Sequence, residues 1–169
     1  MVKFNFGWYL IYTRPKQEHG VSCRLTDRKI LSYLPLIKET RNWKDRKKVV
    51  QSPVFPSYVF VYLNTLQEFY DAGAVDGACY YVRYNNCPAR VSEEDIKYIR
   101  MIEGAGKNIE VCNERFLVGQ RLVITEGPLN GLSCEVASYK GKNRILVRLA
   151  ILQRSLLADL PLYALAQDK

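Results

Sequence analysis

The residues that most clearly suggest a function are aromatic side chains at alternate positions of one apolar segment. Residues 53–62 read Pro-Val-Phe-Pro-Ser-Tyr-Val-Phe-Val-Tyr. In a strand, Tyr58, Phe60 and Tyr62 lie on one face and Val59 and Val61 on the other. The aliphatic face is typical of a sheet surface that helices cover. The aromatic face is either the second side of a core, since aromatic residues are usually buried, or an exposed binding surface.

The same stripe partly resembles the RNA-stacking strand of RNA recognition motifs, in which aromatic side chains stack on bases. Tyr58, Phe60 and Val61 match that motif. Its leading basic residue and glycine are replaced by Pro56 and Ser57, and a bulky Val59 stands where a small residue belongs. Stacking on RNA is therefore the weaker interpretation of the aromatic face.

A basic segment precedes the aromatic strand. Residues 38–48 contain six lysines or arginines and two acidic residues, a net charge of +4 out of +8 for the whole chain. Lysines and arginines bind phosphates by displacing counterions, and an aromatic side chain such as Trp43 can stack on a base. The alternative is a solvated hairpin tip with an incidental aromatic residue. The candidate nucleic-acid-binding residues are Arg41, Trp43, Lys44, Arg46, Lys47 and Lys48.

Patterns typical of catalysis or metal binding are weak. The one histidine, His19, has neither a metal-ligand partner nor a nucleophile at a recognisable spacing. Residues 104–107 resemble a phosphate-binding loop but lack its first glycine and its final Ser or Thr, and Ser133 lacks the second glycine of a nucleophile elbow. The five cysteines are scattered without a Cys-x-x-Cys pair, and we expect them to be small buried residues. We therefore expect a binding protein and not an enzyme, with no cofactor and no metal.

Length and composition indicate a soluble globular protein. A chain of 169 residues suffices for one ordinary domain or two small ones, and 48% hydrophobic with 25% charged residues is typical of folded proteins. The net charge of +8 suggests a polyanionic partner. No stretch approaches the ~20 apolar residues of a membrane helix, and the first residues lack the pattern of a signal peptide. We expect a cytoplasmic protein that does not contact a membrane.

The first half of the chain contains elements that can position these residues. Residues 8–14 alternate as a strand, and Pro15 suits the first turn of a helix that reaches about Arg28, with Val21 and Leu25 on its inner side. A second extended segment, residues 30–40, is interrupted at Pro35. Together with the aromatic strand it predicts a long hairpin with the basic segment at its tip.

Two further helices and a short hairpin are predicted between residues 66 and 104. Apolar residues at helical spacing predict a helix that begins at Leu66 and ends at Gly73. Residues 79–84 and 89–91 predict a hairpin around two asparagines. Ser92 can cap a last helix. The residues expected on the buried side of that helix, and the glycine expected to end it, are Ile96, Ile99, Ile102 and Gly104.

The composition changes from Gly119 onward to short strands separated by turn residues. The strands are predicted at residues 121–126, 133–139, 143–149 and 152–159. Strands this short at this spacing predict a small β-barrel. We therefore expect an α+β fold with an antiparallel sheet and flanking helices in residues 1–104, a linker at 105–117 and a small β-barrel domain in residues 118–169.

Three segments in this order resemble the NusG-like family of transcription elongation factors. Residues 8–12, Trp-Tyr-Leu-Ile-Tyr, look like the first strand of the family, and residues 55–60, Phe-Pro-Ser-Tyr-Val-Phe, look like its Phe-Pro-x-Tyr-x-Phe signature. Residues 119–161 look like its KOW domain. The resemblance covers nearly the whole chain and is closer to the specialised antiterminators, which include RfaH-like factors and those of capsular polysaccharide operons. It implies an NGN-like first domain and an SH3-like KOW barrel.

The resemblance also implies partners. The family's first domain binds the clamp helices of RNA polymerase, and Tyr12, Phe55, Tyr58 and Phe60 would form that patch, which makes the aromatic face an exposed one. The basic hairpin would lie near upstream or non-template DNA, or leader RNA, and the KOW domain would recruit a ribosomal protein or a termination factor. We expect a monomer that suppresses pausing and termination at selected operons, such as surface polysaccharide loci.

The chain departs from this family in two places. The polar motif of RfaH-like factors that contacts the opposite side of the polymerase has no counterpart, residues 69–71 being the nearest. Cys134 stands where KOW domains often carry glycine. The alternative function is an RNA-binding module that acts in translation or ribosome assembly. That module would bind free single-stranded RNA tightly in the absence of polymerase.

Overall fold

The computed structural model divides into two compact units, Met1–Ile96 and Lys97–Lys169, which we describe separately. Lys44 lies outside the residues that the structure describes. Within the described part of the chain, no helix has both the length and the apolar character required to cross a bilayer. The described residues are 4–43, 46–84, 86–105, 110–112, 121–124, 133–139, 142–149, 154–158 and 165–167.

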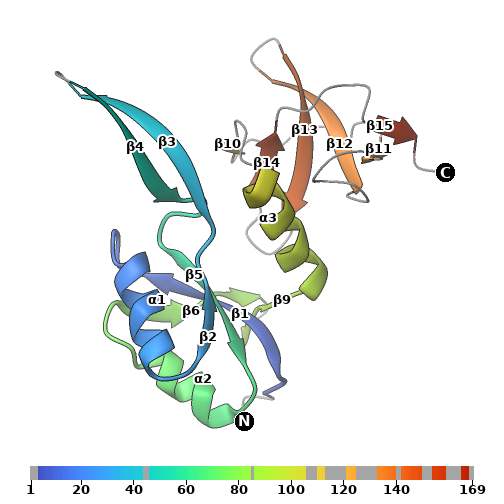
Figure 1. Ribbon diagram of the computed structural model, residues 1–169. Coiled ribbons are helices and arrows are strands. Elements are labelled where there is room, and N and C mark those ends of the chain that lie inside the picture. The colour runs from blue at the N-terminus through green and yellow to red at the C-terminus, as the bar shows by residue number, and fades with distance from the viewer. Residues whose placement is uncertain are drawn as a thin grey trace. The chain divides into compact units, whose positions relative to one another are not determined.

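The first unit is built on an antiparallel five-stranded sheet with the order β2-β5-β1-β6, and β9 also pairs with β1 (Figure 1). Its strands are β1 (Gly7–Thr13), β2 (Leu31–Tyr33), β5 (Tyr58–Leu63), β6 (Ala78–Tyr81) and β9 (Arg90–Val91). In the central pair, Tyr12 lies opposite Tyr58 and Leu10 lies opposite Phe60. Because opposite residues of an antiparallel pair share a face, the two predicted strands combine their aromatic residues on one side of the sheet.

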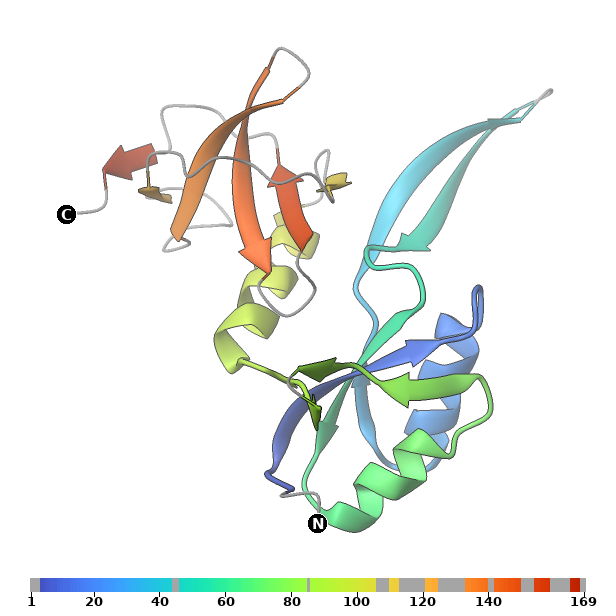
Figure 2. The same ribbon diagram turned by 180° about the vertical axis from the view of Figure 1, so that it is seen from behind.

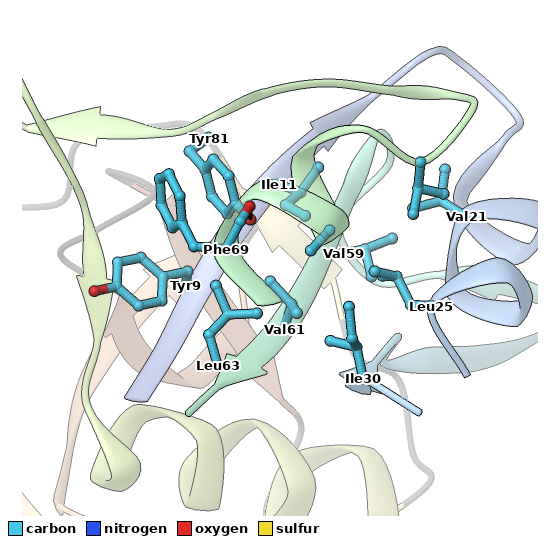
Figure 3. Packing of buried hydrophobic residues seen from close by; sticks show 12 residues of the cluster. Tyr9, Ile11, Val21, Leu25, Ile30, Val59, Val61, Leu63, Phe69 and Tyr81 are labelled. Atoms are coloured by element: carbon cyan, nitrogen blue, oxygen red, sulfur yellow. Dashed lines mark hydrogen bonds between the residues drawn. The ribbon is translucent and has the colours of Figure 1, made fainter. Parts of the chain in front are cut away.

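Two helices, α1 (Glu18–Asp27) and α2 (Leu66–Gly73), cover the other face of this sheet (Figure 1). Figure 3 shows Val59 and Val61 of β5 packed with Val21 and Leu25 of α1 and with Phe69 of α2. Burying an aliphatic or aromatic side chain of this size contributes roughly 1.5–3 kcal/mol. The prediction that helices cover the aliphatic face of the aromatic strand is confirmed.

The segment that connects β6 to β9 differs from the prediction. A minimal hairpin of β7 (Arg83–Tyr84) and β8 (Cys87–Pro88) forms around the two asparagines, but β9 pairs with β1 and places Val91 opposite Trp8. The expected hairpin of residues 79–84 with 89–91 is therefore wrong for Arg90 and Val91, whereas the N–H of Ala89 does donate to the carbonyl oxygen of Val82, at 2.8 Å. The physical reason is burial, because Val91 is buried opposite the equally buried Trp8 of β1.

A separate two-stranded ladder of β3 (Leu36–Trp43) and β4 (Arg46–Pro53) projects from the first unit (Figure 2). At its base, the N–H of Val54 donates to the carbonyl oxygen of Pro35 at 2.8 Å. The break between β2 and β3 falls at Leu34 and Pro35, as the proline predicted. The long hairpin expected from the sequence is confirmed.

Helix α3 (Glu93–Ala105) begins in the first unit and continues beyond Ile96, where the two units divide. The N–H of Asp95 donates to the Oγ of Ser92 at 3.0 Å, which confirms the predicted cap. The helix continues one residue beyond the expected end at Gly104. The three isoleucines expected on its inner side, Ile96, Ile99 and Ile102, are all buried.

In the second unit, the described residues form a six-stranded antiparallel sheet with the order β10-β14-β13-β12-β11-β15. Its strands are β10 (Glu110–Cys112), β11 (Arg121–Ile124), β12 (Ser133–Tyr139), β13 (Lys142–Leu149), β14 (Arg154–Ala158) and β15 (Leu165–Gln167). The four predicted strands correspond to β11–β14. Strand β10 lies inside residues 105–117, which were expected to be a linker, and it pairs with β14. Closure into a KOW barrel and the domain limits at 104 and 118 stay predictions.

Gly77 occupies a position of the first unit where a side chain would be strained. Its φ is +90°, and an added Cβ would lie 2.9 Å from the Cγ2 of Val21. We expect Gly77→Ala to lower the free energy of unfolding by about 1–3 kcal/mol, as measured in urea. Gly104→Ala is the control, because a Cβ there meets nothing within 4 Å and alanine favours a helix. A Gly77→Ala variant as stable as the parent would contradict this packing.

Candidate functional site

Three tyrosines from adjacent strands form a row on the face of the sheet opposite α1 and α2. In the register, Tyr12 of β1 lies opposite Tyr58 of β5 on one side and Tyr80 of β6 on the other. The ring centroids of Tyr12 and Tyr58 are 5.4 Å apart in an edge-to-face contact, and those of Tyr12 and Tyr80 are 5.0 Å apart and stacked. Tyr12 and Tyr58 are half-buried, whereas Tyr80 is 58% exposed. We call these three residues the tyrosine row.

The most exposed member of the tyrosine row, Tyr80, is uncharged at neutral pH. The pKa of the Tyr80 hydroxyl is raised above its ordinary value of 10.0, first by desolvation and then by the neighbouring Tyr12, Tyr58 and Cys79. A raised pKa means that the hydroxyl keeps its proton throughout the physiological range. Tyrosine rings whose hydroxyls reach solvent combine an apolar contact area with a hydrogen-bonding group, which suits a protein interface.

Phe55 and Phe60, which were expected to be exposed beside Tyr12 and Tyr58, are 1% and 0% exposed. The rings of Phe55 and Phe60 meet edge-to-face at 5.9 Å, and Phe60 also contacts Tyr33 at 6.0 Å. The expectation of a fully exposed aromatic face is therefore wrong for these two residues, because Tyr33 of the neighbouring strand β2 and Phe55 before β5 supply rings that pack against Phe60. Their role in polymerase binding stays a prediction, and Tyr12 and Tyr58 are the two candidates with accessible rings.

Tyr80 was missed by the analysis of the sequence. Residues 79–84 were expected to form a strand, but alternation within that strand does not tell which neighbour it joins. The position of Tyr80 beside Tyr12 depends on the strand order β5-β1-β6. The only available signal was that Tyr80 lies in a segment expected to be a strand.

The turn that enters β5 is held by two other elements. Ser57 has a φ of 67°, in the left-handed region that residues other than glycine seldom adopt. Its N–H donates to the Oε1 of Glu18 in α1 at 2.7 Å, and its carbonyl oxygen accepts from the N–H of Thr13 in β1 at 2.8 Å. The turn therefore connects the end of β1, the start of α1 and the start of β5.

The register of the basic hairpin separates its charged positions onto two faces. Position 41 lies opposite Lys48 and position 43 lies opposite Arg46, so these four positions share one face of the ladder. Lys47 lies opposite Asn42 and belongs to the other face. Arg46, Lys47 and Lys48 are exposed. The side chains of Arg41 and Trp43 lie outside the described part of the structure.

Three of the five cysteines differ from their expected burial. Cys23, Cys79 and Cys87 are free and exposed, because they lie on the outer side of α1, on the edge strand β6 and in the β7–β8 hairpin. His19 is an exposed residue of α1. Within the described residues, no three His, Cys, Asp or Glu side chains are grouped as a metal site requires.

Comparison with solved structures supports the fold of this chain. A structure of NusG described as "Domain interaction in Thermotoga maritima NusG" is 17% identical over 98% of this chain and 98% of that chain, with a TM-score of 0.55. Another, the MjSpt4:Spt5 complex in conformation A, is 14% identical over 94% of this chain and 96% of that chain. Its TM-score of 0.32 is too low to support a conclusion.

Comparison with protein families assigns the first unit. The family model described as "Transcription termination factor nusG" matches residues 6–100, which is more than half of the 169 residues. The match includes β1 and β5, which carry Tyr12 and Tyr58, and also the basic hairpin. The antiparallel sheet covered by helices agrees with the solved NusG structure. This chain therefore belongs to the NusG family of transcription factors.

Proposed function

We propose that this protein is an elongation factor that binds RNA polymerase and suppresses pausing and termination, acting at selected operons such as surface polysaccharide loci. The observation that carries the proposal is the tyrosine row on the face of the sheet opposite α1 and α2 in a NusG-family domain. The row supplies contact area and hydroxyl groups, and the proposed partner surface is the pair of clamp helices of the polymerase. Phe55 and Phe60 are the buried aromatic residues beside the row in this scheme.

The tyrosine row suits a persistent complex because its rings are already arranged. Tyr12 contacts both neighbours, so binding need not order three independent side chains, each of which would otherwise cost roughly 0.5–1.5 kcal/mol. Tyrosine is among the residues that dominate binding energy at protein interfaces. The factor then acts by holding the polymerase, without a catalytic step.

The basic hairpin provides the second contact in this proposal. Arg46 and Lys48 are exposed on one face of a ladder that projects from the sheet, and such groups bind phosphates without reading bases. Lys47 is exposed on the other face, which makes no phosphate contact in this proposal. The proposed ligand is upstream or non-template DNA. The second unit is proposed to form a KOW domain that recruits a ribosomal protein or a termination factor.

The test of this function is a transcription assay. The purified full chain is added to core RNA polymerase on a template with a pause site and a terminator, and pause lifetime and read-through are measured. Shorter pauses, more read-through and co-migration with polymerase are expected. Increased termination would contradict antitermination while keeping polymerase binding. Tight binding to free single-stranded RNA without polymerase would instead support an RNA-binding module of translation or ribosome assembly.

The two faces of the basic hairpin make a separate prediction. Arg46→Ala or Lys48→Ala is expected to reduce the slope of log affinity for forked duplex DNA against log salt concentration by about 1 each, since each phosphate contact contributes about 0.9. Lys47→Ala, on the opposite face, is the matched control and is expected to leave the slope unchanged. The measurement is fluorescence anisotropy at several salt concentrations. Equal slopes for the parent and the three variants would exclude the hairpin as the DNA contact.

A further inference from the structure

We propose that Glu18 is a positioning residue of the tyrosine row. Its buried carboxylate holds Ser57 in the left-handed conformation and thereby determines where β5 begins and where the ring of Tyr58 lies. The inference rests on the proposed function, because it assigns Glu18 an effect on polymerase binding although its side chain lies within the domain.

The first step of the argument is the conformation of Ser57. A φ of 67° is disfavoured for a residue with a Cβ, so the surrounding structure has to hold it. Ser57 is bonded through both of its backbone polar groups, its N–H to Glu18 at 2.7 Å and its carbonyl oxygen to the N–H of Thr13 at 2.8 Å. Of these two contacts, only the one with Glu18 comes from a side chain, so a substitution can remove it selectively.

The second step is the burial of Glu18. The residue is 5% exposed, and a carboxylate is seldom buried unless hydrogen bonds compensate its desolvation. The N–H of Ser57 provides a short hydrogen bond of the charge-assisted kind, and the first turn of α1 favours a negative charge. An apolar side chain would fill the same space but could not accept the N–H of Ser57. The turn therefore requires a hydrogen-bond acceptor at position 18.

The third step connects the turn to the row. Tyr58 follows Ser57 directly, and its N–H donates to the carbonyl oxygen of Phe55 at 3.2 Å. The ring of Tyr58 contacts Tyr12, which stacks on Tyr80. A change in the conformation of Ser57 therefore moves Tyr58 away from the ring that orders it. The contact with Glu18 preorganises the row, which lowers the cost of ordering on binding.

The test uses the full chain with three substitutions. Glu18→Ala removes the acceptor, Glu18→Gln keeps an oxygen that can accept the same N–H, and Glu68→Ala is the matched control. Glu68 also accepts a backbone N–H at 2.7 Å, from Asn64, but it does so at the start of α2 and not at the turn that enters β5. Affinity for core polymerase is measured by titration, and amide hydrogen exchange is followed at Ser57 and Tyr58 in the free protein.

We expect Glu18→Ala to weaken polymerase binding about tenfold, the effect of losing one hydrogen bond to a charged group, and to accelerate exchange at Ser57 and Tyr58. Glu18→Gln is expected to restore both properties to within about threefold of the parent. Glu68→Ala is expected to alter neither affinity nor exchange at these two residues. Unchanged exchange at Ser57 in Glu18→Ala would overturn the inference.

Two outcomes separate this inference from the proposed function. If Tyr58→Ala weakens binding and a folded Glu18→Ala does not, Glu18 is not a positioning residue and the docking surface stands. If Tyr58→Ala leaves affinity unchanged, the proposed docking surface fails, and only the exchange measurement then tests the turn.

Should Glu18→Ala not fold, the double variant Glu18→Ala/Ser57→Gly tests the same point, because glycine adopts this φ without support. Normal binding by that double variant supports the role, and a loss as large as in Tyr58→Ala overturns it.

Discussion

Replacing Phe60 with alanine is expected to lower the free energy of unfolding of the first unit by about 3–5 kcal/mol, the usual cost of removing a buried phenyl ring. The ring is fully buried and contacts Phe55 and Tyr33, so its loss leaves a cavity that neighbouring aromatic residues cannot easily fill. The measurement is urea unfolding followed by tryptophan fluorescence, since Trp8 is buried in the same unit.

The control for this prediction is Tyr58→Ala, two residues away on the same strand and the same face. Tyr58 is half-buried, so its replacement is expected to cost clearly less stability than that of Phe60. A Phe60→Ala variant that unfolds at the same urea concentration as the parent would show that Phe60 is not part of the core in solution. A failure of Phe60→Ala to bind polymerase is evidence of contact only where the variant is shown to be folded.

Replacing Tyr58 or Tyr80 with alanine is expected to weaken binding to core polymerase by roughly 10- to 100-fold, the effect of removing a central aromatic residue from an interface. Each substitution removes one ring from the tyrosine row and leaves Tyr12 with a single aromatic neighbour across the sheet. The measurement is the dissociation constant for core polymerase, with thermal unfolding recorded to show that both variants are folded.

Tyr70→Ala provides the matched control, because Tyr70 is 58% exposed, as Tyr80 is, but lies on α2 against the opposite face of the sheet. Its affinity for polymerase is expected to equal that of the parent. An equal loss in Tyr70→Ala and Tyr80→Ala would contradict the assignment of binding to the tyrosine row. It would instead indicate a second contact at α2, near the residues where the polar motif of RfaH-like factors has no counterpart.

Local structure in this chain could be predicted because it depends on neighbouring residues. The alternation of Val59 and Val61 with Tyr58 and Phe60 follows from strand geometry, and the helices do cover the aliphatic face. The cap at Ser92 was predictable for the same reason, since its bond to Asp95 spans three residues. Family membership also follows from short segments whose residues are contiguous in the chain.

The burial of individual side chains and the grouping of aromatic residues on the sheet could not be predicted, because both depend on segments that are distant in sequence. Phe60 alternates with Val61 as an exposed aromatic residue would, but the ring of Tyr33, from the distant strand β2, packs against it. Tyr80 joins Tyr12 only through the strand order β5-β1-β6, and β9 leaves the expected hairpin to bury Val91 opposite Trp8.

The sequence by itself therefore determined most of the helices and strands, the two faces of the aromatic strand, the basic hairpin and the family. Only the tertiary structure decided which aromatic rings support the sheet and which, as the row of Tyr12, Tyr58 and Tyr80, remain accessible. The reason is physical. Backbone geometry determines where a side chain points from its own strand, whereas the exposure of that side chain is set by what the rest of the chain packs against it.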